Sequence, residues 1–448
     1  MRIKIQKIPI QEIAFAMDGI YNGTNNPAIE YITTDSRKAE SGDLYIPLKG
    51  KRFNGEDYVL ELIGKNVFTV SELYSSAQIK VKSTTSSLLN FASYYSQNLP
   101  FILYKIGITG SVGKTTTKEF TKILFSTCYK THANQGNFNN EIGLPISLLS
   151  APIETEALIL ELGMNHRGEI ERLSKCLCPD AAIITNIGSA HIGNLGSREE
   201  IANAKKEITE GMTGGKVYIP REEKLLYDLK NKVTVSIDSK DADYYLESLD
   251  ERISIYKGGT KYTHANFVFK EPHLKKCLIF ACALAIDCGI PPDILSKGIS
   301  SISKYNIRQT IITKGDYLFY TDFYNASPES ILASYNSIKN IPIINKKHLL
   351  LGDVLELGKM SQDIHYKIGQ SIPKDLFDEI FLFGDFAHFT KDGAIESGFS
   401  ESKIHINSLL SMPELTAMQI KKYCKFGDLI LMKASRGIRL ERVLDFFE

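Results

Sequence analysis

The 448-residue chain has no long apolar run and no recognisable leader segment. No stretch reaches the ~18 to 20 consecutive apolar residues that a membrane-spanning helix needs. The first residues, MRIKIQKIPIQEIAF, carry basic side chains but no continuous apolar core and no small-residue cleavage site. We therefore expect no signal peptide and no membrane insertion.

The chain also lacks a charge excess and a cysteine framework. Lysine and arginine total 53 against 52 aspartates and glutamates, a formal net charge of +1. This balance gives no bulk field for nucleic acid or an anionic membrane, so we expect neither partner. The seven cysteines are scattered, and only Cys176 and Cys178 lie close together, without a matching Cys or His cluster. Such a set is typical of free thiols in a reducing compartment, so we expect a cytoplasmic protein. We also expect a monomer.

The length predicts about three domains of roughly 150 residues each. Residues 1–100 mix short β-like runs, such as 43–48, with a helical pattern over 86–98 that ends at Leu99-Pro100. We place the other two domains at 101–311 and 312–448. The chain shows no internal repeat and no low-complexity tract.

Apolar runs at 101–108, 157–160, 181–187 and 217–219 each end in a glycine or polar turn, with helical segments between them. This alternation predicts a doubly wound α/β domain with a mainly parallel sheet. Strands at 348–351, 380–383 and 429–432 predict a second, Rossmann-like α/β domain, and the N-terminal domain reads as a small α/β unit. Residues 221–275 contain short β-like pieces that we do not assign in detail. Binding sites are expected at the carboxyl ends of the strands.

The stretch GITGSVGKTTT (residues 107–117) looks like a phosphate-binding loop. It follows the apolar run FILYKI and precedes a helical stripe of Phe120, Ile123 and Leu124, which is the strand–loop–helix context such a loop requires. The strict pattern G-x-x-x-x-G-K-[ST] asks for glycine at 108, where this chain has Ile108. We let the strand run through Ile108 and place the loop at residues 109–115.

The sequence of this loop predicts which groups would bind the phosphates of ATP. Its backbone N–H groups and the following helix N-terminus can line an anion cavity. Lys114 would reach the terminal phosphates, and the Thr115 hydroxyl would bind Mg²⁺. The predicted ATP-binding residues of the loop are Thr109, Gly110, Ser111, Val112, Gly113, Lys114 and Thr115.

Two further residues at strand ends are candidate Mg²⁺ ligands. Glu161 follows the run 157–160, where a carboxylate would lie beside the phosphate loop. His191 lies on a loop after the run 181–187, at the same sheet edge. Imidazole is an uncommon Mg²⁺ partner, and a loop histidine is more often structural. Residue chemistry alone leaves both interpretations of His191 open.

One lysine is unusual in its spacing. Ser197 and Glu200 form a capping box, so a helix is expected from about residue 198. Its inward face then contains Ile201, Ala204, Lys205 and Ile208, whereas Lys206 points elsewhere. A buried lysine is costly unless paired or modified, and burial lowers its pKa toward a neutral, nucleophilic amine. The alternative is a lysine that snorkels to solvent.

In the third segment, residues 322–328 (DFYNASP) follow a strand-like run. An asparagine here can bond a purine edge, and neighbouring aromatics can stack on the base. The alternative interpretation is an Asx/Pro turn that opens a helix.

Several motifs occur together in an order that resembles the Mur ligase family. They are TGSVGKTTT, NFNNEIGLP, ELGMNHRGEI, TNIGSAH, ANAKKEI, DFYNASPES, LGDVLELG and MKASRGIRLE. The resemblance covers nearly the whole chain and is weakest before residue 100 and over 220–300. It implies a three-domain enzyme that forms an amide bond with ATP through an acyl phosphate. NFNNEIGLP, ELGMNHRGEI and YNASPES favour the member that joins D-Ala-D-Ala to UDP-MurNAc-tripeptide in peptidoglycan precursor synthesis.

The resemblance implies roles for individual residues. Thr115 and Glu161 would hold one Mg²⁺, and His191 a second. Lys205 matches the lysine that this family carbamylates with CO₂, which would make it an anionic Mg²⁺ ligand. Together with Lys114, these residues form the predicted catalytic set of Lys114, Glu161, His191 and Lys205.

The remaining predictions concern nucleotide and substrate contacts. Asn325, Arg308 and Asp353 would contact ATP from the third domain. The predicted substrate contacts are Ser36, Arg37 and Lys49 for the uridine nucleotide, Asn137, Asn139 and Asn140 for the muramoyl peptide, and Lys433, Ser435 and Arg436 for the added dipeptide. NIR replaces the commoner glycine-arginine pair around Arg308, and Ala434 stands where glycine is frequent.

Three other functions remain open on the sequence. Another Mur-type ligase would carry its own third-domain substrate motif, which we do not find. A folylpolyglutamate synthase generally lacks a uridine-nucleotide domain before the phosphate loop. A nucleotide-binding regulator would be free to lose Lys114, Glu161, His191 and Lys205, all of which are present.

Overall fold

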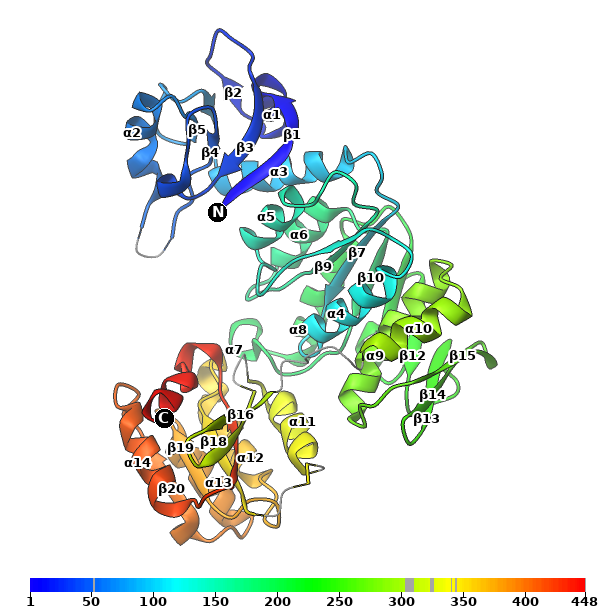
Figure 1. Ribbon diagram of the computed structural model, residues 1–448, viewed down its shortest axis with the longest axis vertical. Helices are drawn as coiled ribbons and strands as arrows, with labels where there is room; N and C mark the ends of the chain where they lie inside the picture. Colours follow the sequence, from blue (N-terminus) through cyan, green and yellow to red (C-terminus); the bar gives the residue numbers. More distant parts are fainter. Residues whose placement is uncertain (51–52, 303–309, 323–325, 340, 343–344, 448) are drawn as a thin grey trace.

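The computed structural model describes residues 1–50, 53–302, 310–322, 326–339, 341–342 and 345–447. Within these residues the chain forms three sheets, each in its own lobe, and the lobes lie in a row (Figure 1). The predicted α/β fold with three sheet-containing units is confirmed. The limits of the three domains stay predictions; the third sheet starts at residue 310, two residues before the expected boundary.

The first sheet has six strands among the described residues and mixes parallel with antiparallel pairs. In spatial order they are β1 (Arg2–Pro9), β3 (Ala28–Thr33), β4 (Leu44–Tyr45), β5 (Phe68–Ser71), β6 (Ile79–Lys80) and β2 (Ile20–Tyr21). Its helices are α1 (Ile10–Ala16), α2 (Val59–Gly64) and α3 (Thr84–Gln97). The Ser83 side chain accepts from Ser86 N and caps α3, which therefore starts two residues before the predicted helix.

The central sheet has nine strands among the described residues, and its middle is parallel, as predicted. The order is β15 (Thr260–Asn266), β14 (Arg252–Lys257), β13 (Tyr244–Leu249), β12 (Lys232–Ser236), β11 (Lys216–Pro220), β10 (Ala181–Ile184), β7 (Tyr104–Thr109), β9 (Ala157–Glu161) and β8 (Thr131–Ala133). Strands β13, β14 and β15 pair antiparallel. The unassigned region 221–275 thus extends the sheet as a meander.

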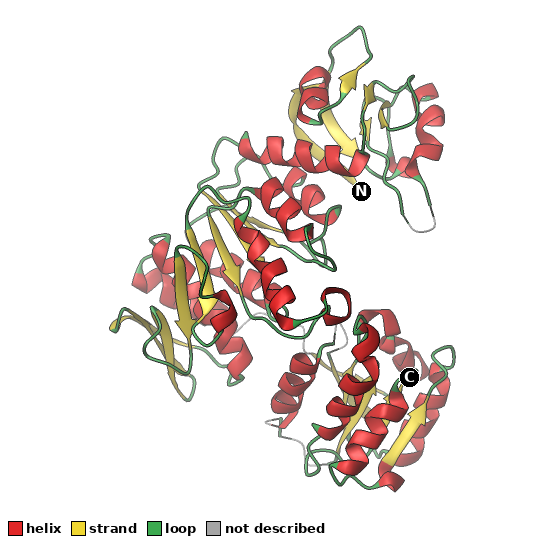
Figure 2. Cartoon of the chain, turned by 180° about the vertical axis from the view of Figure 1, so that it is seen from behind, coloured by secondary structure: helices red, strands yellow, loops and turns green. Residues whose placement is uncertain are grey.

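Helices cover both faces of the central sheet (Figure 2). One face packs on α4 (Lys114–Phe125), α9 (Pro272–Asp287) and α10 (Pro292–Ile302), and the other on α5 (Gly143–Leu149), α6 (Glu169–Leu177) and α8 (Arg198–Lys206). Along β9, Leu158 and Leu160 join one core and Ile159 the other, as side-chain alternation in a strand requires. Helix α3 packs on α5 and α6, so the core of the first unit is continuous with one core of the central unit.

Asp287, at the end of α9, ties that helix to three strands. Its carboxylate pairs with Lys216 and Lys257 and accepts from the hydroxyls of Tyr218 and Tyr244. Burial would raise the pKa of Asp287, but these four donors lower it to about 2. The carboxylate is therefore ionised and bonded in the folded protein.

The third sheet is parallel apart from its first strand. Its order is β16 (Thr310–Lys314), β17 (Tyr317–Thr321), β21 (Leu429–Lys433), β18 (Lys347–Gly352), β19 (Ile380–Phe383) and β20 (Ile404–Asn407). The helices around it are α11 (Pro328–Lys339), α12 (Ser361–Gln370), α13 (Ala387–Glu396) and α14 (Pro413–Tyr423). The predicted strands of this unit are confirmed to within one residue.

Short helical turns connect the larger elements. They are α7 (Ile192–Leu195), η1 (Ser36–Lys38), η2 (Gly55–Tyr58), η3 (Glu207–Thr209), η4 (Lys224–Leu226), η5 (Gly358–Met360), η6 (Glu401–Lys403), η7 (Arg436–Ile438) and η8 (Leu440–Phe446). Across the described residues, none of the helices combines the length and apolarity required to traverse a bilayer.

Candidate active site

The phosphate loop joins β7 to α4, and the strand ends at Thr109 rather than Ile108. Gly113 has φ +86° and caps α4. No described residue accepts a hydrogen bond from the N–H groups of Gly113, Thr115 and Thr116, so three donors converge at this helix N-terminus. The Lys114 Nζ folds over the loop and donates to the carbonyl oxygens of Gly110 at 2.8 Å and Ser111 at 3.3 Å. An anion with several oxygens fits this arrangement of donors.

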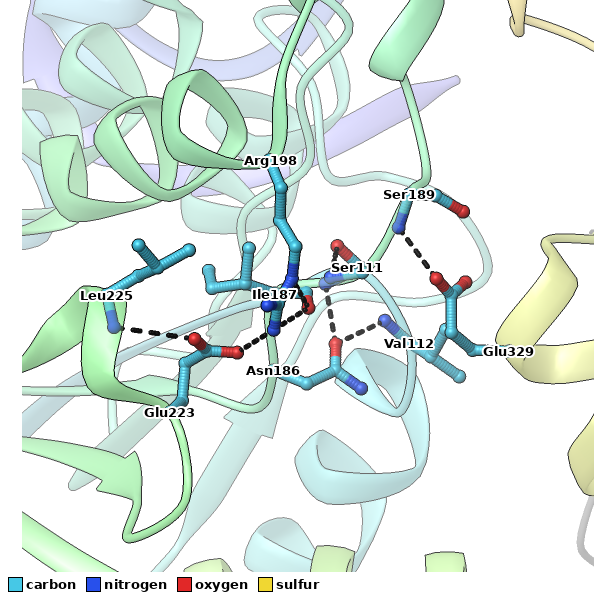
Figure 3. A network of polar contacts seen from close by, with 10 residues as sticks. Ser111, Val112, Asn186, Ile187, Ser189, Arg198, Glu223, Leu225 and Glu329 are labelled. Carbon is cyan, nitrogen blue, oxygen red and sulfur yellow. Dashed lines mark hydrogen bonds and ion pairs between the residues drawn. The ribbon is translucent and has the colours of Figure 1, made fainter. Parts of the chain in front are cut away.

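A short segment after β10 fixes the first half of the loop (Figure 3). The Asn186 Oδ1 accepts from the N–H groups of Ser111 at 3.0 Å and Val112 at 2.9 Å. The Thr185 hydroxyl donates to the Val112 carbonyl at 2.6 Å. Gly110 has φ +146°, and a Cβ there would lie 1.9 Å from Thr185 Oγ1. The loop can approach this strand end only because residue 110 is glycine.

Glu161 lies directly beside the loop. Its Oε2 accepts from the Thr115 hydroxyl at 2.6 Å, and its Oε1 from the Asn139 amide at 2.7 Å. The buried amide of Asn134 donates to the Glu161 carbonyl and accepts from the Glu161 N–H. The structure thus brings the two predicted ligands of the first Mg²⁺ together and adds the predicted substrate residue Asn139.

His191 lies on the loop 188–193, at the start of the short helix α7, with a left-handed φ of +66°. The N–H of Gly188 donates to the Ser111 hydroxyl at 2.8 Å and links this loop to the phosphate loop. The His191 Nδ1 is 2.6 Å from Glu356 Oε2 of the third unit. The ring N–H is not in line with that oxygen, so the contact is a close pair without an aligned hydrogen bond.

Lys205 is 1% exposed and belongs to α8, whose N-cap Ser197 accepts from Glu200 N as the capping box predicts. Burial, and then the charge of Lys114, hold the pKa of Lys205 well below its usual range. Lys206 turns outward and pairs with Asp228 at 2.7 Å. The predicted register of this helix is confirmed, and the snorkelling alternative is wrong.

The predicted substrate residues lie in several places. Asn137 and Asn140 are exposed near Asn139, and the Asn140 Oδ1 accepts from Ile142 N and Gly143 N at the start of α5. In the first unit, the Arg37 guanidinium is exposed and pairs with Asp35, beside Ser36 in η1. Lys49 is exposed as well. These first-unit residues belong to a different lobe from the phosphate loop (Figure 1).

In the third unit, the side chains take local partners. Lys433 is 3% exposed and pairs with Asp322 at 2.8 Å, whereas Arg436 is exposed and pairs with Glu441. The Ser435 hydroxyl accepts from Leu355 N.

Asp353 is buried and accepts from the N–H groups of Asp385 and Phe386. Burial raises the pKa of Asp353 to about 6 against the effect of these bonds. Its carboxylate closes the turn after β19, and its predicted nucleotide contact stays a prediction, like the roles of Lys433, Ser435 and Arg436. Asn325 and Arg308 lie outside the described residues.

Two family models match the chain: the Mur ligase middle domain over residues 108–272, and the Mur ligase glutamate ligase domain over residues 307–436. Together they cover well over half of it. The chain belongs to the Mur ligase family. A Mur ligase from Bacillus subtilis, named UDP-N-acetylmuramoyl-tripeptide–D-alanyl-D-alanine ligase, is 35% identical over 93% of this chain and 92% of its own length.

Solved Mur ligase structures resemble this chain to different degrees. The crystal structure of MurF from Acinetobacter baumannii has a TM-score of 0.85 at 27% identity and covers 99% of both chains. MurF from Thermotoga maritima, solved in complex with ADP, has a TM-score of 0.78 at 26% identity and covers 92% of this chain and 96% of its own. The UDP-N-acetylmuramoyl-L-alanyl-D-glutamate–2,6-diaminopimelate ligase reaches a TM-score of 0.56 at 15% identity, covering 98% of this chain and 99% of its own, which is a likeness of fold.

Sequence reasoning missed five residues that this Mur ligase places around its candidate site. They are Asn134, Thr185, Asn186, Glu329 and Glu356, of which the first holds Glu161, the next two hold the phosphate loop, and the last two contact the loop 188–193. Four of them lie within the family motifs. Membership in a motif does not specify which groups a side chain contacts.

Proposed function

We propose that this chain is an ATP-dependent ligase that joins D-Ala-D-Ala to UDP-MurNAc-tripeptide and releases ADP and phosphate. The observation that carries the proposal is the end-to-end similarity to the Bacillus subtilis ligase and to MurF structures. The similarity to the diaminopimelate ligase is far lower and extends to the fold only. This contrast favours the proposed activity over that of another Mur-type ligase.

The residues of the candidate site fit a magnesium nucleotide. The N–H groups of Gly113, Thr115 and Thr116, which have no acceptor among the described residues, match phosphate oxygens, and Lys114 adds a positive charge. The hydroxyl of Thr115 and the carboxylate of Glu161 offer two oxygens in one place, the ligands that Mg²⁺ prefers. We assign Thr115 and Glu161 to one Mg²⁺, and His191 and a modified Lys205 to a second.

The modification of Lys205 follows from its surroundings. No ion pair or side-chain hydrogen bond joins its Nζ to another described residue, and Lys114 lies close enough to disfavour a second positive charge. A neutral amine at this position can attack CO₂, forming a nitrogen–carbon bond and losing one proton, to give a carbamate. The side chain changes from a potential cation to an anion beside Lys114 and the metal site. Carbamylation thus removes the electrostatic conflict that burial creates.

MgATP supplies the phosphoryl group that converts the tripeptide carboxylate into an acyl phosphate, which the dipeptide amine then attacks. The residues of the chain contribute by positioning the phosphates and the metal-binding side chains. The glycines at 110 and 113 bring the loop close to the phosphates, and Glu161 fixes Thr115 and Asn139 together. The bond from the Asn139 amide to Glu161 supports our assignment of Asn139 to the muramoyl-peptide side of the site. We further propose that the protein acts in the cytoplasm as a monomer.

The direct test is product analysis by mass spectrometry. The purified protein is incubated with MgATP, D-Ala-D-Ala and UDP-MurNAc-tripeptide, with diaminopimelate or lysine as the third residue in separate reactions. We expect UDP-MurNAc-pentapeptide and one phosphate for each molecule formed. Parallel reactions contain UDP-MurNAc-dipeptide with the free third amino acid, or a folate with glutamate. Product in either of these, or phosphate release that needs no acceptor, would refute the proposal.

A further inference from the structure

The third unit contacts the loop 188–193 through two glutamates and one close backbone contact. We call this set of three contacts the clasp. Glu329, in the first turn of α11, accepts from Ser189 N at 2.8 Å (Figure 3). Glu356 places Oε2 2.6 Å from His191 Nδ1, and its carbonyl accepts from Gly193 N at 3.2 Å. Two separate segments of the third unit therefore converge on one loop of the central unit.

The backbone contact is unusually close. A Cβ on Gly193 would lie 2.3 Å from Gly358 N and 2.6 Å from the Glu356 carbonyl oxygen, so only glycine fits at residue 193. Glu356 itself has φ +66°, a left-handed conformation that is uncommon for a glutamate. Such strain persists where surrounding contacts impose it, and it gathers at functional positions.

The other end of the same loop is fixed to the phosphate loop. Gly188 N donates to the Ser111 hydroxyl, and Arg198 donates to the Ile187 carbonyl at 3.1 and 3.2 Å (Figure 3). His191 thus lies on a loop held by the phosphate loop at one end and by the third unit at the other. Any change in how the third unit docks must act on the orientation of this imidazole.

We propose that Glu356 is a positioning residue for His191: it holds the Nδ1 edge of the ring and leaves Nε2 to the second Mg²⁺. This inference rests on the proposed function, which assigns His191 to that metal. Histidines that bind metals almost always give their other ring N–H to a carboxylate or carbonyl, which fixes the tautomer and the ring plane. A carboxylate 2.6 Å from Nδ1 favours the proton on that nitrogen. Because Glu356 comes from the third unit, the second metal site is complete only when that unit is docked.

Mn²⁺ binding tests the assignment without ligation. Free Mn²⁺ is titrated by electron paramagnetic resonance in the presence of β,γ-methylene ATP, for the wild type and for Glu356→Ala, Glu356→Gln and His191→Ala. We expect two sites in the wild type and loss of the weaker one in His191→Ala. In Glu356→Ala that site should weaken by about 10- to 100-fold, the usual cost of removing such a carboxylate partner. Glu356→Gln keeps an acceptor for Nδ1–H and should weaken it less.

A matched control uses another histidine–glutamate pair of the same unit. His405 Nε2 and Glu379 Oε2 are 2.8 Å apart, away from the loop 188–193. Glu379→Gln should leave both Mn²⁺ affinities unchanged. Equal or tighter Mn²⁺ binding in Glu356→Ala would overturn the proposal, the tighter result meaning that Glu356 holds His191 away from the metal. The pentapeptide assay reports separately on the proposed function, because the Mn²⁺ titration does not depend on turnover.

Hydrogen exchange of the metal-free and nucleotide-free protein gives a second readout. The clasp accepts from the amides of Ser189 and Gly193, so both should exchange slowly in the wild type. Glu329→Ala should speed exchange at Ser189 by at least about tenfold, which corresponds to a loss of about 1.4 kcal/mol of protection. The amides of β19 serve as the internal reference for folding. Unchanged exchange at Ser189 in this variant would show that the third unit does not dock on the loop in solution.

Discussion

Replacing Lys205 by alanine should abolish ligation, and the structure indicates the size of the effect. A lysine with an ordinary pKa near 10.4 is neutral in roughly one molecule in 2,500 at pH 7. Each unit by which burial lowers the pKa of Lys205 raises the neutral, CO₂-reactive fraction about tenfold. The protein therefore creates the reactive amine by burying it, and Lys205→Ala removes the group that CO₂ would modify. We expect less than about 0.1% of wild-type turnover, the scale on which loss of a required group is felt in catalysis.

Two variants and one label make this result specific. Bicarbonate should partly restore Lys205→Ala, since it can enter the space that the side chain leaves. Lys205→Met fills that space and should show no such rescue. In Lys206→Ala only a surface pair with Asp228 is lost, so turnover should stay near that of the wild type. A ¹³C NMR carbamate signal from ¹³CO₂ should appear in the wild type and be absent from Lys205→Met. Full activity of Lys205→Ala would refute the reasoning.

The same burial has a consequence for stability. The pKa of Lys205 is lowered by folding, so the unfolded chain binds the proton more tightly at every pH below about 10.4. The resulting free-energy cost opposes folding at neutral pH, and it decreases as the pH rises through the folded-state pKa of Lys205 toward about 10.4. In buffer free of CO₂, Lys205→Met should therefore stabilise the protein at pH 7 by about 1–3 kcal/mol, because methionine has no amine to desolvate. A lower melting midpoint for Lys205→Met would show that Lys205 is better paired than the structure indicates.

Three more predictions follow from individual contacts. Gly110→Ala should abolish ADP binding in calorimetry, because the new Cβ would lie 1.9 Å from Thr185 Oγ1; binding within threefold of wild type would contradict this. Asp287→Asn should remove about 1–2 kcal/mol of stability above pH 4, measured by urea unfolding. The wild-type advantage should shrink as the pH falls from 4 toward 2, because the pKa of Asp287 is lowered in the fold. Ser197→Ala should cost about 1 kcal/mol by removing the cap on α8, and Ser197→Asp should recover it.

The sequence predicted those helices, strands and loops that depend on residues close together in the chain. The cap at Ser197 and the spacing of Ile201, Ala204 and Lys205 are set within three turns of one helix, and the structure reproduces both. The phosphate loop is likewise a local feature, although the strand before it runs from Tyr104 to Thr109 instead of from 101 to 108. The strands of the third sheet are short apolar runs between turns, which are recognisable one at a time.

The rest depends on contacts between distant residues. Strands β13 to β15 join the sheet by antiparallel pairing with one another, which the composition of residues 221–275 does not specify. Glu356 and His191 are far apart in the chain, and no spacing rule relates them. Lys433 is a related case: its motif predicts a substrate contact, and the structure adds an ion pair with Asp322 that the motif does not specify. Motifs name the residues, and only the fold shows what each one contacts.

The core that continues across α3 determines how many rigid bodies the chain forms. The first unit shares one apolar core with the central unit, from Ile3 to Leu229, in addition to a small cluster of its own around Tyr45, whereas the buried cores of the third unit contain no residue of the other two. Ile192, on α7, packs at the edge of both. The chain should therefore behave as two rigid bodies rather than three, with α7 as the pivot. In calorimetry, residues 1–302 should melt as one cooperative unit and the third unit as another, so three lobes correspond to two thermal transitions.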